Sequence, residues 1–374
     1  MLTDIRNKPI CELNKTPIVQ QSAFWSVVKN RLGSKTIAIN FKARKSDLFT
    51  QIDEDIPILS DLLIILQHID RNHTIAYVPY GPELEPSDEI QGRFLEELSE
   101  CIRPFLPKNC ILIRYDLCWR SYWAKDSGDF DEYGIRKSDP EIKTQEFRFN
   151  FNTSNWNFRK ASTNILPSNT IFLDLRQDID TILSRMKRKT RYNIGLSKRK
   201  EIIVRETGIE AIDIWYELYK ETAIRNRLFV NDVKYFRAVL EAKADDTRSP
   251  AKVKLLIAEY QGKPLAAMFL VISGHRGSYL YGASSSLHRN KMATYALQWE
   301  AICISKNAGC TEYDMFGISP SPDPNHPLYG LYKFKSGFGG KMHSTLGCWD
   351  YPLIEQKYNI FRASELNSIG YHLS

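Results

Sequence analysis

The chain has 374 residues, of which 43% are hydrophobic and 12% aromatic, and it carries a formal net charge of +7. This length suits two domains that each bury a core, as in a soluble enzyme. The N-terminus lacks the apolar core of a signal peptide, and the longest apolar run, Leu265 to Ile272, is too short to span a bilayer. The cysteines show no C-x-x-C spacing and the histidines no ligand-spaced pair, so neither a disulfide framework nor a metal site is indicated.

The first part of the chain alternates helical and strand-like patterns. Ser22 is a good N-cap for a helix that carries apolar residues at helical spacing as far as Leu32. Five further elements are expected: a strand over Thr36 to Phe41, a helix over Leu59 to Ile69, a strand over Thr74 to Val78, a helix over Arg93 to Ile102 and a strand over Cys110 to Tyr115. This alternation predicts an α/β domain. The composition turns polar between Lys125 and Asn169, so we place the domain junction in the later part of that stretch.

The second part predicts two amphipathic helices, three antiparallel strands, a third helix and a strand. Trp215, Phe236 and Trp299 lie on the apolar stripes of the three helices. The strands are expected over Leu255 to Tyr260, Leu265 to Ile272, Ser278 to Ala283 and Thr311 to Phe316. This order is typical of acyltransferases of the GNAT kind.

Enzymes of the GNAT kind hold coenzyme A with a glycine-containing loop before the third helix. The corresponding residues here are Arg289-Asn290-Lys291-Met292-Ala293-Thr294. Met292 replaces the glycine that lets a phosphate approach the backbone closely. We therefore expect a GNAT scaffold whose acyl donor is not an acyl-CoA.

A second unusual stretch is basic. Half of the residues from Arg185 to Lys200 are arginine or lysine. This density predicts a surface for phosphate groups, either of a nucleic acid or of a phosphorylated small molecule. The alternative is an ordinary solvated helix face.

The segment from Leu328 to Gly340 predicts a short helix with a lysine on its apolar side. Pro327 suits a first helical position, and Gly339-Gly340 end the helix. At about 100° per residue, Lys335 falls within the apolar arc and Lys333 on the polar side. A desolvated ammonium that meets an anion or a cleft is chemically useful. The alternative is that Lys335 reaches the rim or pairs with a carboxylate.

The stretch Gly330-Leu331-Tyr332-Lys333-Phe334-Lys335-Ser336-Gly337-Phe338-Gly339-Gly340 resembles the C-terminal signature of the FemABX family of non-ribosomal peptidyl transferases. Four further segments agree with the family in order: Gln21 to Lys29, Tyr77 to Pro82, Leu166 to Leu175 and Met186 to Ile194. The resemblance implies an α/β fold of two tandem GNAT-like domains, the first formed by residues 1–160 and 348–374 and the second by residues 161–347. Only about Ala242 to Val253 separates the second predicted helix of the second domain from the next strand, which leaves no room for a coiled-coil arm. The chain is therefore most similar to the arm-less FemX branch.

The resemblance also implies a reaction. An aminoacyl-tRNA donates its amino acid to an amine on the stem peptide of UDP-MurNAc-pentapeptide, or of the lipid-linked form of this peptidoglycan precursor. No cofactor is implied, and we expect a monomer in the cytoplasm or at the inner face of the cell membrane. Two other hypotheses compete. An acyl-CoA-dependent N-acyltransferase is disfavoured by Met292, and an RNA-binding module without catalysis is disfavoured by Lys335.

By resemblance, Phe334 and Lys335 are the pair implicated in transfer. We expect Lys335 to act as a fixed cation that stabilises the oxyanion of ester aminolysis. A general base would need a strongly lowered pKa. Asp116 matches a family position proposed as the base for the acceptor amine, and the alternatives are binding of that amine or a salt bridge to Arg114 or Arg120.

We expect two sets of contacts, and the basic segment supplies the second. The expected substrate contacts are Lys29, Arg114, Tyr235, Tyr281 and Arg225, and the expected tRNA contacts are Lys187, Arg188, Lys189 and Arg191. Lys29 matches a family lysine that binds the diphosphate of the acceptor. A family arginine that assists this lysine aligns with Asn231, so Arg225 or Arg227 is expected to substitute. For the two tyrosines, ordinary packing is the alternative.

Overall fold

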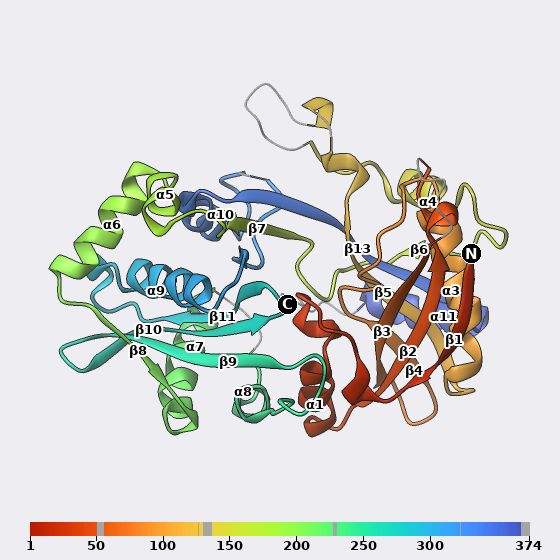
Figure 1. Ribbon diagram of the computed structural model, residues 1–374, viewed down its shortest axis with the longest axis horizontal. Coiled ribbons are helices and arrows are strands. Elements are labelled where there is room, and N and C mark those ends of the chain that lie inside the picture. Colours follow the sequence, from red (N-terminus) through yellow and green to blue (C-terminus); the bar gives the residue numbers. More distant parts are fainter. Residues whose placement is uncertain (51–55, 126, 130–136, 227–229, 322, 368–374) are drawn as a thin grey trace.

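The computed structural model describes residues 1–50, 56–125, 127–129, 137–226, 230–321 and 323–367, and its centre is one long mixed sheet with helices against both faces (Figure 1). The strands are β1 (Leu2–Lys8), β2 (Lys35–Arg44), β3 (Pro57–His68), β4 (Thr74–Val78), β5 (Cys110–Arg120), β6 (Arg159–Lys160), β7 (Asn169–Asp174), β8 (Ile203–Thr207), β9 (Ala251–Tyr260), β10 (Lys263–Ser273), β11 (Arg276–Ser284), β12 (Glu312–Asp314) and β13 (Lys341–Pro352). The helices are α1 (Ala23–Arg31), α2 (Lys45–Leu48), α3 (Gln91–Ile102), α4 (Ile142–Asn150), α5 (Ile179–Ser184), α6 (Arg188–Arg199), α7 (Ile212–Asn226), α8 (Val233–Glu241), α9 (Ala293–Asn307), α10 (Tyr329–Lys335) and α11 (Glu355–Asn367).

The strand order explains how the two halves of the chain are joined. It runs β1-β2-β3-β4-β5-β13-β7-β12-β11-β10-β9-β8, and β6 pairs with β13 outside this path. The start of β13, 341–344, pairs with β7, and its remainder, 345–352, pairs with β5. In Figure 1, β13 (blue) crosses from one half of the molecule into the other. The last strand of the chain therefore makes one sheet of both halves, and the division after residues 160 and 347 stays a prediction.

Most of the predicted elements form where the sequence places them. Ser22 caps α1, because its side chain accepts a hydrogen bond from the backbone N–H of Trp25. The three strands β9, β10 and β11 form the expected antiparallel meander. α8 ends at Glu241 and β9 begins at Ala251, so there is no coiled-coil arm at this connection. The predicted α/β fold class is confirmed.

The helix predicted over Leu59 to Ile69 is wrong, because these residues belong to β3. Leucines in this segment recur at helical spacing, which misled the prediction. In the structure Leu63 and Ile65 face the core that contains α1, and Leu62, Ile64 and Leu66 face the core that contains α3. A strand buried on both faces gives a continuous apolar run that periodicity cannot distinguish from a buried helix.

Two of the apolar cores each belong to one half, and a third is shared. The shared core packs Phe24 and Trp25 of α1 with Trp215 of α7 and Phe269 of β10. Aromatic side chains of this size bury much apolar surface, so the halves stabilise each other. None of the helices in the described ranges has the length and apolar character that crossing a bilayer requires.

Candidate active site

The short helix α10 buries a single side chain, that of Lys335, which is 4% exposed. Lys333 of the same helix is exposed. A 3-10 turn over Ser336–Phe338 follows α10, and Gly339 ends it at φ +83°. The predicted contrast between the two lysines is thus confirmed for their burial.

The ammonium of Lys335 lies on backbone carbonyls instead of a carboxylate. Its Nζ donates to the carbonyl oxygen of Phe316 at 3.0 Å and to that of Gly317 at 2.8 Å. It lies 5.0 Å from the ring centroid of Tyr279. Because an ammonium has three N–H groups, these two hydrogen bonds leave one N–H without an acceptor among the described residues. Burial lowers the pKa of Lys335 to about 7, against an opposing effect of Asp314.

The loop that carries these carbonyls is fixed at several points. Phe316 adopts φ +58°, a conformation that non-glycine residues rarely adopt. Asp314, which accepts from the backbone N–H of Phe316 at 2.8 Å, also accepts from the hydroxyl of Thr170. Pro167 packs beside Gly317 so closely that a Cβ there would lie 3.0 Å from its ring. These contacts therefore hold the two carbonyls in place, and we call the carbonyls of Phe316 and Gly317 the seat of Lys335.

A cavity of about 730 Å³ opens beside α10. Its walls come from α10, the end of α7, strand β11 and the start of α9, and include Phe334 and Tyr279. The ring of Phe334 packs against Tyr295 at 5.0 Å and Phe338 at 5.3 Å, both between ring centroids. Phe334 thus faces the cavity while its neighbour Lys335 points into the loop below.

Met292 is the N-cap residue of α9 and also lines this cavity. It adopts φ +60°, the conformation that a glycine would adopt without strain. Its carbonyl accepts from the N–H of Tyr295, and no side chain caps the helix. The turn before α9 therefore has a left-handed residue, as a glycine-containing loop would allow, but a methionine side chain stands there.

A second group of predicted residues meets where the two halves touch. The Nζ of Lys29 in α1 lies 5.3 Å from the ring centroid of Trp25 and 5.6 Å from that of Tyr235 in α8. The hydroxyls of Tyr235 and Tyr281 are 2.7 Å apart. Burial lowers the pKa of Lys29, and within the described ranges this lysine has no acidic partner. The structure therefore brings Lys29, Tyr235 and Tyr281 together around an uncompensated cation.

The proposed substitutes for the family arginine lie elsewhere. Arg225 donates to the carbonyl of Ser284 at 2.9 Å and lines the cavity near Phe334, with no contact to Lys29. Asn231 donates to the hydroxyl of Tyr219. Arg227 lies outside the described residues.

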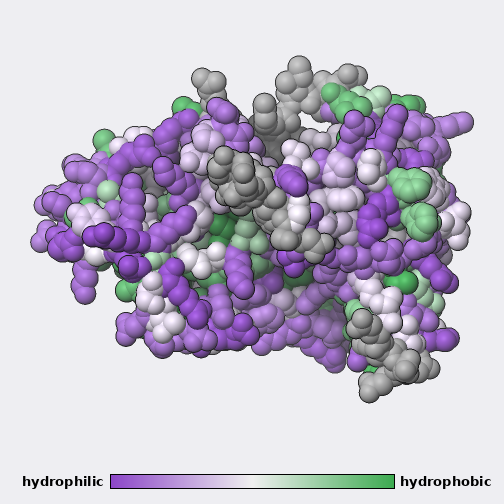
Figure 2. All heavy atoms as spheres, turned by 90° about the horizontal axis from the view of Figure 1, so that it is seen from above, coloured by the Kyte–Doolittle hydropathy of each residue, from purple (hydrophilic) through white to green (hydrophobic). Residues whose placement is uncertain are grey.

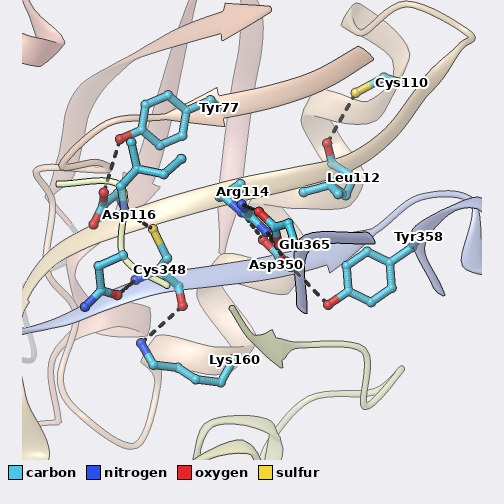
Figure 3. Close-up of polar contacts among 12 residues, drawn as sticks. Tyr77, Cys110, Leu112, Arg114, Asp116, Lys160, Cys348, Asp350, Tyr358 and Glu365 are labelled. Carbon is cyan, nitrogen blue, oxygen red and sulfur yellow. Dashed lines mark hydrogen bonds and ion pairs between the residues drawn. The ribbon is translucent and has the colours of Figure 1, made fainter. Parts of the chain in front are cut away.

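Asp116 is completely buried at the junction of β4, β5 and β13 (Figure 3). Its Oδ2 accepts from the hydroxyl of Tyr77 at 3.1 Å and from the backbone N–H of Leu166 at 2.8 Å. Burial raises the pKa of Asp116 to about 6, although the hydrogen bonds from Leu166, Cys348 and Tyr77 oppose the rise. The carboxylate therefore holds the segment that joins the two halves.

Neither of the arginines considered as its partner contacts Asp116. Arg114 donates to both carboxylate oxygens of Asp350 at 2.7 and 2.8 Å, and to both of Glu365 at 2.6 and 2.9 Å (Figure 3). Arg120 donates to the carbonyl of Ala124. The guanidinium of Arg114 is thus committed to holding β5, β13 and α11 together rather than to a substrate.

The basic segment forms α6 and the turn before it. Its cations are exposed, and none of those from Arg185 to Lys200 makes an ion pair within the part of the chain that the structure describes. Arg191 donates to the carbonyls of Ser184 and Met186, which closes the turn between α5 and α6. The backbone N–H of Lys187 donates to the carbonyl of Gly337 at 2.8 Å. The turn is therefore attached directly to the segment that follows Lys335.

Among the described residues no group of three or more histidine, cysteine, aspartate or glutamate side chains could hold a metal ion.

Comparison with known proteins fits this geometry. A family model described as the FemAB family matches residues 15–250 and 241–365. The chain belongs to the FemAB family. The resemblance found in the sequence motifs is therefore confirmed.

Two curated relatives of this FemAB chain carry the same name. The chain is 22% identical over 253 residues to a lipid II:glycine glycyltransferase of Staphylococcus epidermidis, and 22% identical over 258 residues to that of Staphylococcus aureus. Each match covers 52% of this chain and 61% of the relative, which is less than two thirds of the relative's length. A crystal structure of FemX matches 96% of this chain and all of that chain, with a TM-score of 0.69 and 15% identity. This last likeness shows that the chain has the FemX fold.

Some features of this FemAB site are not readable from the sequence. The carbonyls of Phe316 and Gly317 carry no side-chain signal, because any residue has a carbonyl. Tyr80, whose hydroxyl donates to the carbonyl of Pro167 at 2.6 Å, lies in the segment Tyr77 to Pro82 that resembles the family, but the sequence gives this side chain no role. Its ring also packs against Phe316, so Tyr80 links the first half to the seat of Lys335.

Proposed function

We propose that this chain transfers an amino acid from aminoacyl-tRNA to an amine on the stem peptide of a peptidoglycan precursor. The family and the named glycyltransferase relatives support a transferase that acts on such a precursor. The acceptor is UDP-MurNAc-pentapeptide or its lipid-linked form. We infer that the chain works as a monomer in the cytoplasm or at the inner face of the membrane, where both substrates meet.

The observation that carries the proposal is the buried ammonium of Lys335 beside the cavity that Phe334 lines. In ester aminolysis an amine attacks the carbonyl carbon, an oxyanion forms, and the ribose hydroxyl of the tRNA leaves. The free N–H of Lys335 would donate to this oxyanion or to the leaving oxygen. A fixed donor in a water-poor site is worth more than one in water. Phe334 would shape the wall against which the aminoacyl group lies.

The acceptor would bind at the junction of the halves. Lys29 has no acidic partner among the described residues, where it is flanked by aromatic rings, so a diphosphate would satisfy this cation. Tyr235 and Tyr281 would hydrogen-bond the sugar or the phosphates with their paired hydroxyls. Arg225, on the cavity wall, would contact the donor end instead of assisting Lys29.

The donor would approach over the basic turn and α6. Arg188 and Lys189 are exposed and make no ion pair with any residue that the structure describes, so they suit RNA phosphates. Lys187 and Arg191 are partly engaged in holding the turn, and their cations would add to the local potential.

Mass spectrometry tests the proposal. The protein is incubated with UDP-MurNAc-pentapeptide or lipid-linked precursor and a pool of charged tRNAs, and the precursor is then weighed. We expect the added mass of one or more amino acid residues, and an identical reaction with deacylated tRNA and free amino acids gives the control. No added mass with either acceptor would refute the proposal, and acetyl transfer in a parallel reaction with acetyl-CoA would favour the acyl-CoA alternative.

A further inference from the structure

One face of α6 carries an aromatic ring between two arginines. Arg188, Tyr192, Gly195 and Arg199 are spaced by four, three and four residues, so they lie along a single side of the helix. The side chain of Tyr192 is 59% exposed, which is unusual for a residue that could have packed inward. We call these four residues the α6 stripe.

The parts of the stripe are arranged around the tyrosine ring. The guanidinium carbon of Arg199 lies 5.6 Å from the ring centroid of Tyr192. It reaches there across Gly195, where an added Cβ would lie 3.3 Å from Nη1 of Arg199. Gly195 therefore leaves a flat surface on which the guanidinium and the ring lie side by side.

No carboxylate of the described part of the chain pairs with the two arginines of the stripe. Arg188 and Arg199 are exposed and make no ion pair within the described ranges. Figure 2 shows the end of the molecule that α5 and α6 form, at the left, covered mainly by hydrophilic side chains. An exposed aromatic ring in such surroundings gains nothing from core packing, whereas it can stack on a nucleobase while the arginines meet phosphates.

We propose that the α6 stripe binds the donor RNA, with Tyr192 as a stacking platform for an unpaired base and Arg188 and Arg199 as phosphate contacts. This proposal rests on the proposed function for the identity of its ligand. It adds Tyr192 and Gly195 to the basic surface that the sequence predicts over Arg185 to Lys200, and it gives Arg199 of that surface a defined role beside Arg188.

The stripe lies on the element that is attached to the catalytic helix. Gly337, two residues after Lys335, packs against Thr190 so tightly that a Cβ would lie 2.3 Å from its hydroxyl oxygen. The N–H of Lys187 donates to the carbonyl of Gly337 at 2.8 Å. RNA held on α6 is thereby placed at a fixed distance from Lys335.

Fluorescence anisotropy with two labelled probes, deacylated tRNA and an unstructured single-stranded RNA, tests the stripe over a range of salt concentrations. We expect Tyr192→Leu to weaken binding of both probes by about 5- to 100-fold without changing the salt dependence, because stacking is not ionic. Tyr192→Phe keeps the ring and is expected to bind like the wild type. Arg188→Gln and Arg199→Gln are each expected to reduce the slope of log affinity against log salt by about one.

Arg71→Gln is the matched control, since it removes one exposed positive charge from the first half of the chain. Wild-type affinity in Tyr192→Leu, or an equal loss of slope in Arg71→Gln, would overturn the stripe. Binding that depends on Tyr192 and the arginines without any amino acid transfer would leave the stripe standing and remove the proposed reaction. If the wild-type protein transfers an amino acid but Tyr192→Leu binds RNA as tightly as the wild type, the proposed reaction stands and the stripe is refuted.

Discussion

Replacing Lys335 by methionine removes the ammonium and keeps a side chain of similar length. If its free N–H donates to the transition-state oxyanion, its loss is expected to lower kcat by about 10²- to 10³-fold, or about 2.7–4 kcal/mol. Lys333→Met is the matched control, because it makes the same chemical change two residues away on the exposed side of α10. We expect near wild-type transfer from this control.

The same substitution has a second, pH-dependent signature in folding. The pKa of Lys335 falls from its ordinary value of 10.5 to about 7 in the folded protein. Between these values the unfolded chain binds more protons than the folded one, so the free energy of unfolding rises with pH across this window. At 1.36 kcal/mol per pKa unit the full rise is on the order of 5 kcal/mol. Lys335→Met lacks this group, so its free energy of unfolding is expected not to show this rise with pH.

Two measurements complete the test of Lys335. Single-turnover transfer from charged tRNA gives the rate of the chemical step, and denaturant unfolding at pH 7 and pH 9.5 gives the stability difference. If the cation acts on the oxyanion, the wild-type rate falls as the pH rises above about 7, since Lys335 becomes neutral. The opposite result would be a wild-type rate that rises as the pH passes 7, with no such rise in Lys335→Met. That result would identify Lys335 as a general base. Equal losses of transfer in Lys333→Met and Lys335→Met would refute the special role of the buried lysine.

Substitutions at Lys29, Asp116 and Gly337 test the neighbouring contacts. Lys29→Met is expected to raise KM for UDP-MurNAc-pentapeptide about 10-fold or more with little change in kcat. Lys29 makes no ion pair within the described residues, so the substitution removes a charge for the substrate without breaking a salt bridge of the protein. An unchanged KM would contradict this role. Asp116→Asn keeps an oxygen that can accept from Leu166 and is expected to retain transfer, whereas Asp116→Ala leaves the hydroxyl of Tyr77 and the N–H of Leu166 unpaired and is expected to lower the free energy of unfolding by about 1–3 kcal/mol for each in a denaturant titration; complete loss of transfer in a stably folded Asp116→Asn with an unchanged pKa of Lys335 would support Asp116 as the base. Gly337→Ala is expected to lower both stability and transfer, and adding Thr190→Ala is expected to restore them. The reason is that the new Cβ clashes with the hydroxyl of Thr190, whereas the Cβ of Thr190 lies 3.6 Å away. No rescue in the double variant would contradict the packing of α6 on this segment.

The sequence predicts elements well where capping or turn residues mark their ends. The helix α1 carries a capping serine, and the meander β9–β11 has turn residues between its strands, so even β10, which apolar cores cover on both faces, is predicted as a strand. The prediction fails at β3, because apolar cores cover both faces of that strand and remove the alternation that marks a half-exposed strand. The error therefore arises from tertiary packing, which local periodicity does not record.

The candidate site divides in the same way. Lys335 was predictable because it breaks the pattern of its own helix, and a buried charge is visible as a polar residue on an apolar arc. Its partners were not, since backbone carbonyls leave no mark in the sequence. Arg114 shows the opposite failure: an arginine beside a candidate acid suggests a substrate contact, but its partners Asp350 and Glu365 are more than 200 residues away in the chain.

The segment between the halves explains why Asp116 and Lys335 can depend on each other without contact. Asp116 accepts from the N–H of Leu166, and the next residue, Pro167, accepts from Tyr80 and packs on Gly317. The carbonyl of Gly317 in turn accepts from Lys335. Because each step is a hydrogen bond or a close packing contact, a shift of Leu166 would move the seat of the ammonium. Loss of transfer after a change at Asp116 is therefore informative about a base only when the pKa and burial of Lys335 are shown to be unchanged.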